Sequence, residues 1–348
     1  MSKPLSLVMI LAAALSFTMG TAAQNPTATI SNGQLTATLY LPDAKNGFYR
    51  GTRFDWSGVV SSLEYKGHNY IGTWYQASDP GVLDFEYRGD QIVTGPCSTM
   101  IGVPEEFLTI PNKTAFGWEE AKAGGTFVKI GVGVLRKPDD KPYDHARLYP
   151  IVDGGKWTVK RKADSIEFTQ TVNDSESGYG YIYSKRVTLV PGKAQMTIEH
   201  TLRNTGSHPI LGEVYDHNFT RWDNETPNPD YSMSFAFDPK VGEPLGNMPL
   251  AINGRTVTFT RALSDRDAVR ARPEGFGPDA KDYDFRFENK KLGIGLRATA
   301  DKPLAHATIW SIRSVFAIEP FISLNIQPGS ESNWKLTYDA YTLPVSGK

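Results

Sequence analysis

The chain has 348 residues, 40% of them hydrophobic, which is enough for one large domain or two of ordinary size. Its 37 basic and 38 acidic side chains leave a net charge of -1, and the sequence contains no lysine- and arginine-rich cluster interleaved with aromatic residues. This balance argues against a nucleic acid or another polyanion as a partner.

The N-terminal segment MSKPLSLVMILAAALSFTMGTAAQ has three parts. A lysine near the start precedes an apolar run over residues 5–17, and small residues follow as far as Ala23. This order is typical of a secretory signal peptide. The apolar run is shorter than the roughly 20 residues that cross a bilayer, which argues against an anchor. We expect cleavage after Ala23, with residues 24–348 exported to a bacterial periplasm or beyond and not held in a membrane.

Cys97 is the only cysteine, so an intramolecular disulfide cannot form. An exported protein without disulfides depends on the size of its core, which this length permits. The surrounding TGPCSTM contains no histidine, and a structural thiol is therefore favoured over a nucleophile.

Strands are predicted through most of the chain, because β-branched and aromatic residues alternate with polar ones. The alternation covers residues 35–41, 156–162, 165–172, 181–190, 194–202, 256–263, 292–300, 304–312 and 333–343. Turn signals such as Pro191-Gly192 separate these segments, and only residues 115–125 have a helical pattern. The prediction is an all-β, antiparallel sandwich with few short helices, formed as one domain over residues 24–348 because no linker interrupts it.

Two segments read as insertions between strands, residues 72–117 and 221–249. Both are rich in proline, glycine and aspartate, which indicates loops. Loops are the usual place for a functional site on a β scaffold.

The segment MTIEHTLRNTGSHPILGEVYDHNFT ends with a histidine, His217, among acids and aromatic residues. It resembles aldose 1-epimerases (galactose mutarotases) and their hexose-phosphate epimerase relatives. In that family an Asn-Thr-Gly turn precedes a strand that delivers the general acid, a histidine that matches His217. The later VFAIEPFISLNIQPGSESNWKLTYDAY resembles the family's C-terminal segment, whose general base matches Glu319. The resemblance covers residues 51–341 and implies a β-supersandwich of the galactose mutarotase-like type.

The chemistry that this resemblance implies needs one acid and one base beside the anomeric carbon, and no metal or organic cofactor. A histidine and a carboxylate suit it because their pKa values lie near working pH. We expect the apolar strand around Glu319 to raise the pKa of its carboxyl group by desolvation. Two structural alternatives stay open: an ion pair between Glu319 and Arg313, and a hydrogen bond from His217 to Asp216 or a backbone carbonyl.

Sugar-binding residues follow less directly from the resemblance. His145, in YDHARLY, is the nearest match to the family's first histidine. The family's sugar-binding arginine has no clear counterpart, and Lys129 or Arg136 in FVKIGVGVLRK stands in its region.

Further candidates come from the residue types that carbohydrates contact. Arg53 and Asp55, in TRFDWSG, form either a solvated entry loop or a set for sugar hydroxyls and an attached acid group. Trp222 is the best placed of several loop aromatics for stacking on a sugar, and Asp216 adjoins the proposed acid. The predicted partner is a mono- or oligosaccharide, with the sugar and the oligomeric state left open.

Other functions compete with the epimerase prediction. The dispersed histidines do not form a zinc motif, although a calcium ion in the loop over residues 223–230 stays an alternative. Asp216 and Glu319 could serve a glycoside hydrolase or a lyase on the same fold. A non-catalytic carbohydrate-binding protein is the third candidate.

Overall fold

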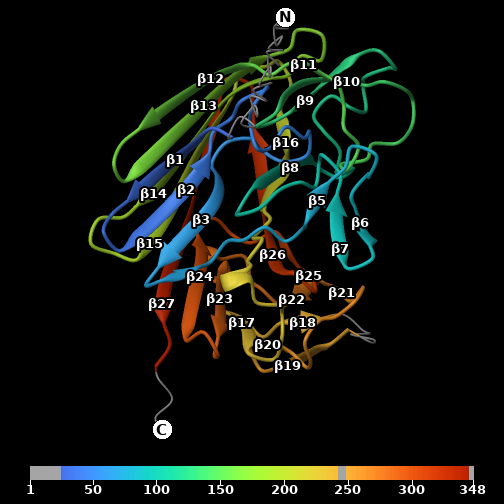
Figure 1. Cartoon of the computed structure of the whole chain (residues 1–348). Helices are drawn as coiled ribbons and strands as arrows, with labels where there is room; N and C mark the ends of the chain where they lie inside the picture. The colour runs from blue at the N-terminus through green and yellow to red at the C-terminus, as the bar shows by residue number, and fades with distance from the viewer. Residues whose placement is uncertain (1–24, 242–247, 345–348) are drawn as a thin grey trace, which may run out of the picture.

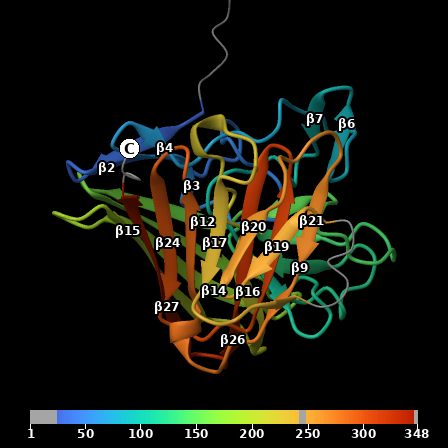
Figure 2. The ribbon, with the colours of Figure 1, turned by 90° about the horizontal axis from the view of Figure 1, so that it is seen from below.

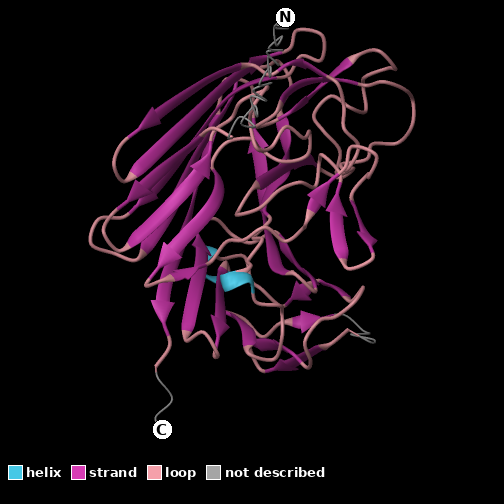
Figure 3. Cartoon of the chain, in the orientation of Figure 1, coloured by secondary structure: helices cyan, strands magenta, loops and turns pink. Residues whose placement is uncertain are grey.

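The computed structural model describes residues 25–241 and 248–344, and its elements are almost all strands (Figures 1 and 3). Within these residues the helices are two 3-10 turns, η1 (Trp222–Asn224) and η2 (Ala280–Asp282). None of the described helices has the length and apolarity to cross a membrane. The all-β prediction is confirmed, and the predicted signal peptide lies outside the described residues.

A ten-stranded antiparallel sheet forms one layer of the molecule. Its strands are, in spatial order, β12 (Lys156–Arg161), β13 (Ser165–Asn173), β14 (Gly180–Leu189), β15 (Gln195–Asn204), β27 (Glu331–Thr342), β24 (Ile294–Ala300), β23 (Asp284–Asn289), β17 (Tyr231–Phe235), β20 (Thr256–Phe259) and β19 (Leu250–Asn253). Buried residues alternate with more exposed ones along β13 and β27, as expected for a sheet with one face on the core.

A five-stranded antiparallel sheet packs on the ten-stranded one. Its order is β21 (Ala268–Ala271), β25 (His306–Ile312), β26 (Val315–Ile326), β16 (Ile210–Asp216) and β8 (Glu105–Thr109). Phe107 of β8 is fully buried between the layers, where its ring meets Tyr183 at 5.3 Å and Trp334 at 6.2 Å. The other face of this sheet carries the candidate catalytic residues.

Four small sheets complete the structure. One sheet contains β1 (Thr27–Ser31), β2 (Leu35–Tyr40), β3 (Val59–Tyr65) and β4 (His68–Asn69), and a second contains β9 (Thr126–Lys129), β10 (Gly133–Arg136) and β11 (Ile151–Asp153). The third contains β5 (Ala77–Ser78), β7 (Gln91–Thr94) and β6 (Phe85–Arg88), and the fourth pairs β18 (Lys240–Val241) with β22 (Pro273–Glu274). In both views β6 and β7 lie on the opposite side of the molecule from β2 and β15 (Figures 1 and 2).

Each of the nine predicted segments contains a strand, although residues 260–263 lie beyond the end of β20, and three other sequence predictions need correction. Residues 115–125 form turns and no α-helix, because Gly117 and Gly124 take left-handed φ values of 85° and 89°. Residues 72–117 are not only loop, since they contain β5 to β8, and residues 221–249 are not only loop either, since they contain β17 and β18. The sequence hid β8 because it is buried along nearly its whole length, which removes the polar alternation.

Candidate active site

One face of the five-stranded sheet gathers the candidate catalytic residues. In the strand register Phe321 of β26 lies opposite both His306 of β25 and Tyr215 of β16. Opposed side chains share a face, and so do residues two apart on one strand. Glu319, two residues before Phe321, and His217, two residues after Tyr215, therefore project from the same side of the sheet.

His217 and Glu319 contact each other directly. His217 Nε2 lies 3.0 Å from Glu319 Oε1, and their side chains are 5% and 12% exposed. His217 follows the last residue of β16, and its backbone N–H donates to the carbonyl oxygen of Pro104 at 2.8 Å. Residues about a hundred positions apart in the sequence thus meet as an imidazole and a carboxyl group in contact.

Aromatic rings fix the plane of the His217 imidazole. Phe219 stacks on it with ring centroids 3.6 Å apart, while Phe54 and Trp310 present their edges at 6.0 and 5.4 Å. No described residue bonds to Nδ1, and Nε2 faces Glu319. The structural alternative of a side-chain bond from His217 to Asp216 is therefore not what the structure contains.

The alternative ion pair between Glu319 and Arg313 is also absent. Arg313 donates instead to the backbone oxygens of Asp265 and Asp90, at 2.8 and 2.5 Å. Both acceptors belong to exposed turns away from the pocket, so Arg313 ties loops together.

Burial and mutual charge set the pKa values of the two groups. Burial lowers the pKa of His217 below its ordinary value, although the carboxylate of Glu319 partly offsets this. Burial opposes ionisation of Glu319, but His217, Arg53 and Arg270 together bring its pKa below the ordinary value. Desolvation acts in the expected direction, but the expected net rise in the pKa of Glu319 is wrong, because neighbouring positive charge outweighs burial.

The two residues open into a pocket of about 80 Å³. Its lining combines flat rings with polar groups, namely Phe54, Trp74, Phe85, Phe219 and Trp310 with Arg53, Asp84, Ser98, His145 and Arg270. An adjoining outer pocket of about 220 Å³ shares Arg53, His145, Arg270 and Glu319 with it. A few convergent polar groups among aromatic rings are typical of small-molecule sites.

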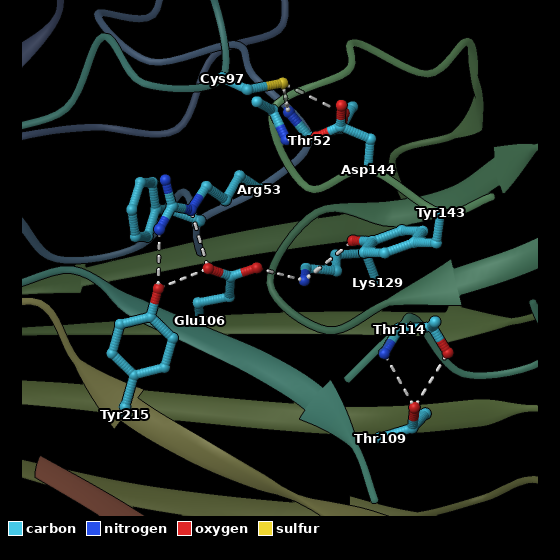
Figure 4. A network of polar contacts seen from close by, with 12 residues as sticks. Thr52, Arg53, Cys97, Glu106, Thr109, Thr114, Lys129, Tyr143, Asp144 and Tyr215 are labelled. Carbon is cyan, nitrogen blue, oxygen red and sulfur yellow. Dashed lines mark hydrogen bonds and ion pairs between the residues drawn. The ribbon is translucent and has the colours of Figure 1, made fainter. Parts of the chain in front are cut away.

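A network of buried charges holds Arg53 in place (Figure 4). Arg53 Nε donates to Glu106 Oε2 at 2.8 Å, and its Nη2 donates to the Tyr215 hydroxyl at 3.0 Å. Lys129 Nζ donates to the other oxygen of Glu106 at 2.9 Å. Burial opposes ionisation of Glu106, but Lys129 and Arg53 hold its pKa far below the ordinary range. No described residue accepts from Arg53 Nη1, which leaves that group for a ligand.

Lys129 itself does not reach the pocket, which corrects its prediction as a sugar ligand. Its side chain is fully buried and lines neither pocket. Its ammonium is bound to Glu106 and lies 3.3 Å from the Tyr143 hydroxyl (Figure 4). Lys129 therefore contacts the carboxylate that holds Arg53.

Asp55 and Asp216 also lie outside the pocket. Asp55 is fully buried and bound by Lys185 Nζ at 3.1 Å, in the layer between the sheets. Asp216 precedes His217, and the alternation of a strand turns it to the other face, where it accepts from the Tyr283 hydroxyl at 2.8 Å. The predicted sugar contacts of both residues, and a hydrolytic pair of Asp216 with Glu319, are not supported.

Arg136 and Trp222 are the remaining corrections. Arg136 ends β10 as an exposed residue and donates to the carbonyl oxygen of Gly124 at 2.5 Å. Trp222 is fully buried against Tyr70 and Tyr231, at 5.0 and 5.8 Å between ring centroids. Proximity to His217 in the sequence misled the prediction, because η1 turns this ring into the core.

The first carboxylate of the suggested calcium loop, that of Asp223, is engaged by protein contacts. Asp223 Oδ2 lies 2.6 Å from His68 Nδ1, and Oδ1 accepts from the backbone N–H of Asn69 at 2.9 Å. Among residues 25–241 and 248–344, no three histidine, cysteine, aspartate or glutamate side chains cluster as metal ligands would.

Comparison with known proteins places this site on a known scaffold. No protein-family model matches the sequence, and no curated protein matches it. Solved structures match over most of the chain. A galactose mutarotase-like protein from Clostridium acetobutylicum is 12% identical with a TM-score of 0.56, covering 93% of this chain and 97% of its own. The chain has the galactose mutarotase-like fold.

Two further structures agree. A candidate aldose 1-epimerase from Escherichia coli K12 has 13% identity and a TM-score of 0.53, covering 91% of this chain and 99% of its own. A galactose mutarotase-like protein from Lactobacillus casei ATCC 334 has 14% identity and a TM-score of 0.52, covering 91% and 100%. Identities this low establish the mutarotase-like fold, and the chemistry has to be argued from the residues of this site.

The sequence prediction missed several residues of the pocket, among them Asp84, Arg270 and Trp310. Arg270 and Trp310 are direct cross-strand partners on β21 and β25. The alternation in LAHATIWSI was visible, but it does not say which face carries the site. Asp84, which accepts from Ser98 Oγ at 2.5 Å, lies in a loop and left no periodic signal.

Proposed function

We propose that this protein is an exported aldose 1-epimerase-like enzyme that interconverts sugar anomers by general acid and base catalysis. The observation that carries the proposal is the 3.0 Å contact of His217 with Glu319 at the floor of an aromatic pocket. A base and an acid that already touch can flank one anomeric centre, which is what this reaction needs.

In this mechanism Glu319 removes the proton of the anomeric hydroxyl while His217, as an imidazolium, protonates the ring oxygen from Nε2. The bond between the anomeric carbon and the ring oxygen breaks, giving the open-chain aldehyde. After the carbonyl group has rotated, the hydroxyl formed from the ring oxygen attacks the opposite face of the carbonyl carbon. His217 then recovers its proton and Glu319 returns the other, so the protein is unchanged and no other reactant is consumed.

The neighbouring groups have separate tasks in this proposal. Arg53 and His145 border both pockets and donate to sugar hydroxyls, while the ring of Trp310 packs against the sugar's C–H face. The inner pocket measures about 80 Å³, roughly the volume that two or three water molecules take up in the liquid. A sugar ring that reaches Glu319 therefore extends into the outer pocket.

The deciding experiment follows anomer exchange on several aldoses by polarimetry or NMR, at high enzyme concentration and above the spontaneous rate. Acceleration that requires both His217 and Glu319 supports the proposal. A protein that binds a sugar without accelerating exchange is a carbohydrate-binding protein. Release of reducing ends from an oligosaccharide would favour a hydrolase, with Asp84 as the second carboxylate in the pocket.

Export is proposed from the N-terminal segment alone. Expression of the full chain in a bacterial host, followed by N-terminal sequencing of the periplasmic fraction, is expected to give a mature chain that starts at Gln24. Retention of the whole chain in the cytoplasm would remove this part of the proposal.

A further inference from the structure

The outer pocket is bordered by more positive than negative side chains. Its cationic members are Arg53, Lys113, Arg270 and Arg272, and its carboxylates are Glu106, Glu213 and Glu319. Two histidines, His145 and His306, stand beside them. An anionic ligand can use this excess only if groups of the protein already hold the carboxylates, and the contacts of the carboxylates decide this.

Each of the three carboxylates has partners within the protein. Glu106 accepts from Arg53 and Lys129, and Glu319 contacts His217. Glu213, only 3% exposed, is contacted by Lys113 and lies 3.1 Å from His306 Nε2. These contacts engage every carboxylate of the outer pocket.

Arg270 and Arg272 remain. Arg270 lies in the edge strand β21 and Arg272 directly follows its last residue, Ala271; both side chains are exposed and border the outer pocket. Within residues 25–241 and 248–344, neither forms an ion pair or a side-chain hydrogen bond. Both line the outer pocket, and Arg270 also lines the inner one beside Glu319.

We propose that Arg270 and Arg272 make the outer pocket a subsite for an anionic group on the sugar, a carboxylate or a phosphate or sulfate ester. A planar guanidinium donates two parallel hydrogen bonds to such a group, and two guanidiniums border the same pocket here. The group would rest beside Phe321, whose ring is stacked between Tyr215 at 4.4 Å and His306 at 3.8 Å. This inference rests on the proposed function for its sugar and adds the substrate class.

Binding, and not turnover, tests the subsite, so that a failure of catalysis does not obscure it. The mature protein is titrated by calorimetry with galactose, galacturonate and galactose 6-phosphate at low and at high salt. Charge-assisted hydrogen bonds predict that an anionic sugar binds about 10- to 100-fold more tightly than galactose at low salt. The advantage should shrink as salt rises, because Arg270 and Arg272 are exposed. The stronger of the two anionic ligands identifies the group.

A substitution separates the subsite from general electrostatics. Arg272→Gln is expected to lower the ratio of anionic to neutral affinity about tenfold. Arg161→Gln, an exposed arginine on β12 of the other sheet, makes the same change in net charge and should leave the ratio as it is. Circular dichroism of both variants checks that they fold.

Three outcomes overturn the subsite. Equal affinity for galactose and the anionic sugars removes the subsite and leaves the epimerase proposal intact. The same conclusion follows if Arg272→Gln and Arg161→Gln have the same ratio of anionic to neutral affinity. If none of the three sugars binds, both the subsite and the proposed function are removed.

Discussion

Glu105 and Glu106 are neighbours in the chain, yet their carboxylates lie on opposite faces of β8. Glu105 points into the layer between the sheets, where it is bound by Lys185 and by His200 Nε2 at 2.7 Å. Glu106 points to the site and holds Arg53. One strand therefore ties the buried charges of the core to the pocket, and a shift of β8 would disturb both.

Glu319→Gln is expected to remove most of the activity while retaining binding. The amide keeps the shape of the side chain and can no longer accept a proton, and loss of a general base typically costs ~100- to 10,000-fold in rate. Anomer exchange by NMR, with sugar affinity by calorimetry, measures both effects. Glu199→Gln, on the exposed side of β15, is the matched control. Full activity in Glu319→Gln would place the base elsewhere.

The pH profile of kcat/KM is expected to peak on the acidic side. Burial lowers the pKa of His217 from 6.5, so the imidazolium that donates to the ring oxygen is lost as pH rises through a value below 6.5. The pKa of Glu319 lies below 4.5, so its carboxylate is lost only as pH falls through that lower value. Background-corrected polarimetry should find the maximum between the two limbs. His217→Asn should abolish the alkaline limb, and a limb that survives belongs to another group.

Glu106→Gln is expected to destabilise the protein and to weaken sugar binding. The change leaves the buried ammonium of Lys129 without its countercharge, and breaking a buried ion pair costs about 3–5 kcal/mol. Urea unfolding measures the loss. Glu167→Gln breaks ion pairs with Lys160 and Arg186 at the surface, where about 1 kcal/mol or less is at stake. Equal effects of the two variants would contradict the assigned role of Glu106.

Asp216→Asn is expected to keep the activity and to gain stability near neutral pH. Burial, with the charge of Glu105, raises the pKa of Asp216 well above its ordinary 3.8. When a carboxyl group has a higher pKa in the folded state than in the unfolded chain, the free energy of unfolding falls as pH rises above the pKa of the unfolded chain. Asparagine does not titrate, so it removes that dependence. Urea unfolding between pH 4 and 7 should show a shallower decline than in the wild type. A large loss of activity would return Asp216 to the site.

The sequence determined the strands whose buried and exposed side chains alternate, because alternation is a local property, and it missed strands such as β8 that are buried along nearly their whole length. It also determined Glu319 and His217 as candidates, since their residue types and strand contexts match a known order of motifs. These predictions used neighbours in the chain, and residues such as Ser165–Asn173 lie on a strand as the pattern required. The resemblance was confirmed at the level of fold.

The tertiary structure alone decided which residues reach the pocket. Asp216 and His217, or Glu105 and Glu106, carry the same local signal, yet the pairing of β8, β16 and β26 sends one of each to the core and the other to the site. The pKa of Glu319 likewise depends on Arg53 and Arg270, which reach it from distant strands and loops. Register between strands far apart in sequence fixes these distances, and no local pattern encodes it.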